Sequence, residues 1–118
     1  MRNFKELKIW QKGFKIAVNS FRITESFPVQ EKYGLALQKN KAAVSIPSTI
    51  AEGSSRNSDK DYGRFAEISF GSAFELETQL LIAKEIKYGN NALVDQTLAM
   101  LAEEEKMLTS FINTLSQK

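Results

Sequence analysis

The chain contains no cysteine and no histidine, and it has only two prolines and six glycines among its 118 residues. The missing cysteines exclude disulfides and thiol nucleophiles, and the missing histidines exclude Ser-His catalysis and the usual zinc sites. Few prolines and glycines favour long, uninterrupted helices. The longest aliphatic run covers residues 80–83, far too short to cross a membrane, and no signal peptide is evident. We therefore expect a cytoplasmic protein without a cofactor.

The size of the chain predicts one domain over residues 1–118. A hydrophobic content of 42% and a charged content of 25% are ordinary for a globular protein. The net charge is only +2, but residues 1–57 hold ten Lys+Arg against four Asp+Glu, and residues 58–118 hold six against ten. This asymmetry indicates either an anionic partner or two parts of a protein that attract each other.

Apolar residues recur every three to four positions over four segments, near residues 5–24, 29–52, 58–88 and 91–116. Ser58 and Asn90 or Asn91 have the character of N-caps, and Gly53 that of a helix-terminating residue. In the first segment we expect the core face to hold Leu7, Trp10, Phe14, Ala17 and Phe21. The pattern predicts an all-α fold, an antiparallel up-down four-helix bundle whose second helix is kinked at Pro47.

Three of these helices carry more apolar residues than one core-facing stripe needs. Exposed stripes would promote aggregation, so they indicate a homo-oligomer in which neighbouring copies cover them. A bent bundle that buries wider faces by itself would explain the same pattern. The expected interface residues are Ile9, Ile16, Ile23, Phe70, Phe74, Leu81, Met100 and Met107.

Basic residues follow one side of the first helix and continue into the second helix and the loop after it. Such a row can neutralise successive phosphates of RNA or DNA, although most lysine rows are simply solvated helix faces. The candidate nucleic-acid-binding residues are Lys8, Lys12, Lys15, Arg22, Lys39, Lys41 and Arg56.

Carboxylates cluster at Glu75 and Glu77 and again at Glu103–Glu105. Di-iron sites in helical bundles pair Glu with His, and this chain has no His. We therefore expect these carboxylates to face solvent, with no metal site. Because Ser45, Ser48 and Ser72 also lack a histidine base, we expect no enzymatic activity.

A set of motifs distributed along the chain resembles those of the four-helix-bundle proteins encoded in 23S rRNA intervening sequences. The resemblance covers nearly the whole chain and rests on Gln38–Ala43, Ser45–Gly53 and Arg56, with Phe4, Leu7, Trp10, Gln11, Phe27-Pro28, Glu31, Tyr33-Gly34-Leu35, Phe65, Gly71-Ser72 and Glu75–Leu80. The chain departs from the family pattern at Thr49, where Asn is usual. It departs again at Asn40, where a basic residue is common, which leaves Lys39 and Lys41 to supply the charge.

The resemblance implies a non-enzymatic bundle assembled as a homopentamer. Relatives of the family include the accessory variability proteins of diversity-generating retroelements, which are thought to engage nucleic acid and a reverse transcriptase. Two functions therefore stay open. One is contact with an RNA or DNA backbone through the basic stripe. The other is a protein-protein scaffold or accessory subunit of a larger enzyme, without affinity for nucleic acid.

Overall fold

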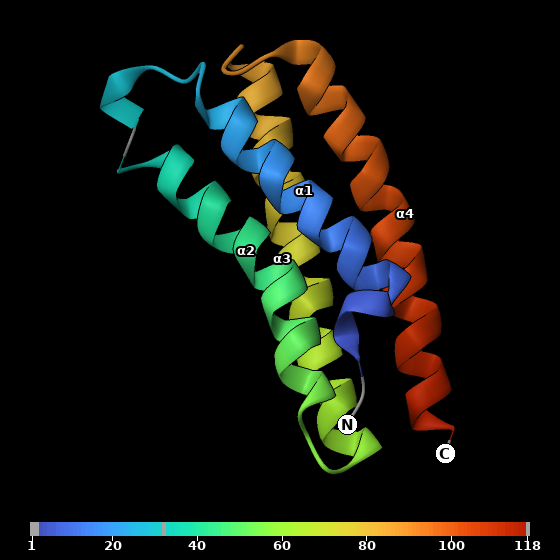
Figure 1. Ribbon diagram of the computed structural model, residues 1–118. Helices are drawn as coiled ribbons and strands as arrows, with labels where there is room; N and C mark the ends of the chain where they lie inside the picture. Colours follow the sequence, from blue (N-terminus) through green and yellow to red (C-terminus); the bar gives the residue numbers. More distant parts are fainter. Residues whose placement is uncertain (1–2, 32, 118) are drawn as a thin grey trace.

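A computed structural model describes residues 3–31 and 33–117 of the chain. It contains four α-helices, α1 (Lys8–Thr24), α2 (Leu35–Ser54), α3 (Asp59–Glu85) and α4 (Asn91–Ser116), with 3-10 turns at Phe4–Glu6 and Val29–Glu31. The helices lie side by side, with α2 against α3, α3 against α4, and α1 against both α2 and α4 (Figure 1). No strand occurs in the described residues. The four-helix bundle predicted from the sequence is therefore confirmed.

The helix starts of α3 and α4 follow from their capping residues. The side-chain oxygen of Ser58 accepts a hydrogen bond from the backbone N–H of Asp61 at 3.1 Å. The side-chain oxygen of Asn90 accepts one from the N–H of Leu93 at 3.0 Å. Each cap satisfies one backbone donor that the first helical turn leaves unpaired. Helix α2 begins later than expected, at Leu35, because a 3-10 turn follows Pro28.

Helix α2 continues through Pro47 and through Gly53 to Ser54, so the expected end near Glu52, with Gly53 just beyond the helix, is wrong. Gly53 instead faces α3. A Cβ atom at this position would lie 2.8 Å from the Cβ of Phe65 and 2.9 Å from the Cδ1 of Tyr62. The residue is therefore small because two helices approach closely there. The kink at Pro47 and the antiparallel arrangement stay predictions.

The core face of α1 matches the expected one only in part, since Ala17 is buried and Leu7 and Trp10 pack against the core as partly buried residues. Ile9, Ile16 and Ile23 are 5%, 0% and 0% exposed, whereas Phe14 and Phe21 are each 50% exposed. The cause is the narrow space in front of α1, where a Cβ on Gly13 would lie 3.1 Å from the Cγ2 of Ile46. The inward face accommodates isoleucine beside small residues, and it leaves the large aromatic rings outside.

The remaining core follows the predicted stripes of α3 and α4. The buried hydrophobic residues of these two helices are Tyr62, Ala66, Ala73, Leu76, Leu80, Ala83, Val94, Leu101, Leu108 and Leu115. Among the described residues, no helix combines the length and the hydropathy needed to cross a membrane.

Candidate functional site

The aromatic rings excluded from the core line a groove between α1 and α2. One part of it has a volume of about 610 Å³ and the other about 360 Å³, and both parts share Phe21 and Val44. Together they form one continuous trough, called here the α1–α2 groove. Its apolar lining includes Trp10, Phe14, Val18, Phe21, Phe27, Leu37 and Val44.

Lys39 lies buried behind the wall of this groove. Its ammonium donates hydrogen bonds to Ser20 Oγ at 2.7 Å, to Thr24 Oγ1 at 2.8 Å and to Asn40 Oδ1 at 3.1 Å, and it also reaches the carbonyl of Ser20. The Phe27 ring lies 5.5 Å from the same nitrogen. Burial lowers the pKa of Lys39 to about 7. Because the side chain is fully enclosed, the prediction that Lys39 contacts nucleic acid is wrong.

The hydrogen bonds around Lys39 also determine how Asn40 is oriented. Its Oδ1 atom accepts from Ser20 Oγ at 2.9 Å, from Thr24 Oγ1 at 3.2 Å and from the Lys39 ammonium. A lysine ammonium can only donate, so the amide oxygen must be the atom that faces it. The amide nitrogen of Asn40 forms no hydrogen bond with any described residue, and Asn40 lines the groove. The groove therefore contains an oriented donor that no described residue uses.

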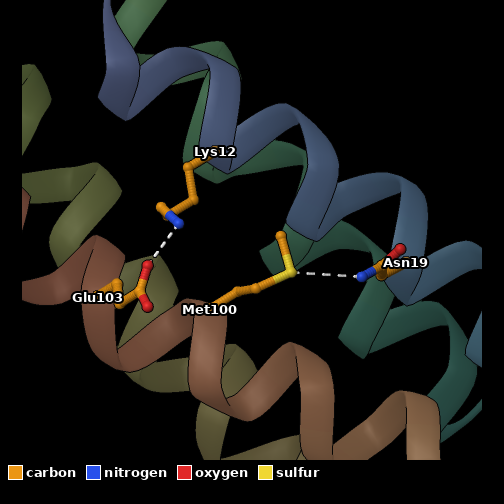
Figure 2. Close-up of polar contacts among 4 residues, drawn as sticks. All are labelled: Lys12, Asn19, Met100 and Glu103. Carbon is orange, nitrogen blue, oxygen red and sulfur yellow. Dashed lines mark hydrogen bonds and ion pairs between the residues drawn. The ribbon is translucent and has the colours of Figure 1, made fainter.

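The predicted basic stripe is divided by an ion pair between α1 and α4. The Lys12 ammonium lies 2.6 Å from Glu103 Oε2, and near it Asn19 Nδ2 donates to Met100 Sδ at 3.5 Å (Figure 2). The hydrogen bond and charge of Lys12 lower the pKa of Glu103. The positive charge of Lys12 is therefore partly compensated within the chain.

Three other cations of α1 keep their charge uncompensated. Lys8, Lys15 and Arg22 are exposed and form no ion pair with any residue in the described ranges. Lys41 is exposed on α2 at the groove. Arg56 lies beyond the end of α2, 3.8 Å from Glu52 Oε2 and over the Phe65 ring at 4.5 Å. The seven predicted residues thus do not form one surface.

The residues predicted for an oligomer interface are also divided. Ile9, Ile16 and Ile23 belong to the core of the single chain and are not available to a neighbour. Phe70, Met100 and Met107 are partly buried against the core. Phe74 and Leu81 lie on the surface, 49% and 50% exposed.

Another apolar surface on α3 was not expected from the sequence. Ile68, Ile82 and Ile86 are 51%, 46% and 47% exposed, and Glu75 lies seven residues from both Ile68 and Ile82. Seven residues make almost two helical turns, so these positions share one side of α3. We call Ile68, Glu75, Ile82 and Ile86 the α3 stripe. The spacing is visible in the sequence, but the first prediction concentrated on the neighbouring phenylalanines.

The expectation that the carboxylates face solvent is wrong for Glu104. This side chain is fully buried, and neither of its oxygens has a hydrogen-bond partner among the described residues. Its Oε2 lies 3.1 Å from the place that a Cβ on Gly13 would occupy. Burial raises the pKa of Glu104 to about 8, and the charge of Lys12 opposes that rise.

Glu105 of α4 and Glu77 of α3 form a pair of neighbouring carboxyl groups. Burial and the neighbouring Glu77 raise the pKa of Glu105 to about 8. In the part of the chain that the structure describes, no three His, Cys, Asp or Glu side chains are placed to hold a metal ion.

The comparisons with known proteins agree with this architecture. The family model for the 23S rRNA-intervening sequence protein matches residues 5–110. The chain belongs to this family. The fold of this chain is similar to that of a crystal structure from Bacteroides thetaiotaomicron. That structure is described as a protein with unknown function from the S23 ribosomal protein family. The two chains share 20% identity at a TM-score of 0.78, with 88% of this chain and 97% of that chain covered. No curated protein matches the sequence.

Proposed function

We propose that this protein is a non-enzymatic helical module that assembles with copies of itself through its exposed apolar surfaces. The observation that carries the proposal is the α1–α2 groove, where Phe14 and Phe21 are each half exposed beside Val44 and Leu37. Contiguous apolar surface of this kind on a helical bundle is typical of an interaction site. The family resemblance predicts five copies.

Light scattering of the purified chain at micromolar concentration tests this proposal. A mass near five times the 13.3 kDa of one chain is expected. Phe14→Ser with Phe21→Ser should shift the mass to that of one chain, because the two substitutions remove both aromatic rings from the groove. Neither ring belongs to the buried core, so the fold should persist. Ala99→Ser, on the exposed side of α4, is the matched control and should not change the mass. A wild-type protein that stays a monomer would refute self-assembly.

A second candidate function is contact with an RNA or DNA backbone. The observation that favours it is the row of Lys8, Lys15 and Arg22, whose charges have no partner among the described residues. Positions seven residues apart on a helix lie about 10.5 Å apart, so the row extends for roughly 21 Å. Assembly would repeat this row and raise the apparent affinity for a long polyanion.

Binding of a long RNA and a long DNA at several salt concentrations tests this function. The affinity should fall steeply with added salt, because each neutralised phosphate releases a counterion. Reversing Lys8, Lys15 and Arg22 to Glu should abolish binding. Reversing Lys60, Lys87 and Lys106 produces the same change in net charge elsewhere and should weaken binding much less. Equal effects of the two triple variants would contradict a specific row. Docking of a larger enzyme, such as a reverse transcriptase, stays a prediction.

A further inference from the structure

We propose that the α1–α2 groove and the α3 stripe are the two halves of one head-to-tail contact between copies of this chain. In this contact the α3 stripe of one copy lies in the groove of the next, with Glu75 against Lys41 and Asn40. The inference rests on the self-assembly proposed above, and it adds which surfaces meet and in what register.

The charge of the groove supports this pairing. Among the described residues that line it, Lys41 is the single charged side chain. Lys41 lies between Leu37 and Val44 at helical spacing, so apolar residues of α2 flank the cation on both sides. It forms no ion pair within the described part of the chain. A partner that covers the apolar residues must also provide a negative group for Lys41, since a buried unpaired charge is costly.

Asn40 adds a second requirement for an acceptor. Its amide oxygen is occupied by Ser20, Thr24 and Lys39, and its amide nitrogen is left without a partner in the described residues. The donor lies one residue from Lys41, and both residues line the same part of the groove. A carboxylate can accept from both groups, and a hydrogen bond to a charged group is stronger than one between neutral groups.

The α3 stripe has the opposite composition. Glu75 is exposed, has no ion pair among the described residues, and lies seven residues from isoleucines on either side. An apolar stripe with a central carboxylate thus matches a largely apolar groove that contains the cation of Lys41 and the amide donor of Asn40. Helix-in-groove recognition uses apolar anchors at this spacing. The two halves of the chain also differ in charge, with a basic excess in residues 1–57 and an acidic excess in residues 58–118.

The two surfaces have similar lengths. The groove follows α2 from Ala36 to Ala51, and the α3 stripe runs from Ile68 to Ile86. These intervals are fifteen and eighteen residues, or about 23 Å and 27 Å of helix. Because the two surfaces differ, the contact is heterologous. Repeated copies then form a closed ring or an open filament rather than a two-fold dimer.

Two charge reversals on the full chain test the inference by light scattering. Lys41→Glu and Glu75→Lys should each weaken assembly at least tenfold, because each places like charges in every contact. An equimolar mixture of the two variants should assemble again. In the mixture each contact between unlike copies contains one positive and one negative group, so the copies must alternate and only even numbers can close a ring. The double variant in one chain should also recover.

Lys106→Glu, on the outer side of α4, is the control for net charge and should assemble like wild type. If the single reversals assemble normally while Phe14→Ser with Phe21→Ser does not, the groove binds something other than the α3 stripe, and the inference is wrong while self-assembly stands. If the single reversals weaken assembly but neither the mixture nor the double variant recovers it, Lys41 and Glu75 do not face each other and the inference is wrong. A monomeric wild type would overturn both proposals.

Discussion

Two buried ionisable side chains, Lys39 and Glu104, differ in how their polar atoms are satisfied. Lys39 has four oxygen acceptors within hydrogen-bonding distance. Glu104 has none among the described residues, and its Oε2 lies beside Gly13. A carboxyl group without partners in a packed core is stable only in its neutral form, because ionisation would add an unpaired charge.

The stability of the protein should therefore decrease as the pH rises. The pKa of Glu104 is raised to about 8 in the folded chain, against the ordinary value of 4.5. Between these values the folded state holds a proton that the unfolded state has lost, so the free energy of unfolding falls with increasing pH. Glu104→Gln removes this titration and should flatten the dependence by on the order of a few kcal/mol across this range. Urea denaturation of both proteins at about pH 5, 6.5 and 8 measures the free energy of unfolding across this range.

Two other titrating groups, Glu105 and Lys39, also shape the pH profile. The pKa of Glu105 is raised to about 8 by burial and by Glu77, so this group also lowers the free energy of unfolding as the pH rises. The pKa of Lys39 is lowered from 10.5 to about 7. Between these values the unfolded state binds more protons than the folded state, so Lys39 raises the free energy of unfolding with increasing pH. Lys12 faces Glu104, and its positive charge opposes the rise in the pKa of Glu104. A Glu104→Gln variant with the full wild-type slope would show that Glu104 does not titrate in this range.

At the scale of the helices, close approach between α2 and α3 depends on one glycine. Gly53→Ala should destabilise the protein by about 1–3 kcal/mol, although alanine favours helix more than glycine does. The added Cβ would lie 2.8 Å from the Cβ of Phe65, so the two helices would have to separate. Thermal unfolding followed by circular dichroism measures the loss.

Gly63 provides a matched control within α3. An added Cβ there meets no atom within 4 Å, so Gly63→Ala should stabilise the protein by roughly 0.5–1 kcal/mol through helix propensity alone. Opposite signs for the two substitutions are the expected result. Similar effects of both would mean that propensity, rather than helix packing, determines the outcome at Gly53.

The helices show how far the sequence predicts the structure. Ser58 and Asn90 predict the starts of α3 and α4, because capping depends on local chemistry that a sequence displays directly. The core face of α1 was not predictable from periodicity, since the isoleucine stripe and the aromatic stripe are both apolar. The useful signal was the small Gly13 and Ser20 beside the isoleucines. Burial of Lys39 and Glu104 depends on packing between helices, which no local pattern reveals.

For the molecule as a whole, the exposed apolar surfaces connect folding with assembly. The groove and the α3 stripe share no residue, so a neighbour on each side could cover both surfaces of every copy at once. The basic row of Lys8, Lys15 and Arg22 neither lines the groove nor belongs to the α3 stripe, so a head-to-tail assembly does not require these residues. Self-association and contact with a polyanion are therefore compatible functions of one bundle.

Assembly should make the thermal stability depend on protein concentration. Association stabilises the folded state by mass action, so a tenfold rise in concentration adds about 1 kcal/mol per chain for a pentamer. For a domain of this size the melting temperature should increase by about 3–6 °C. Phe14→Ser with Phe21→Ser should melt at one temperature at all concentrations, because its groove no longer binds a neighbour. Differential scanning calorimetry at protein concentrations of about 10 and about 100 µM distinguishes these outcomes. A wild-type melting temperature that does not change with concentration would mean that the bundle folds and functions as a single chain.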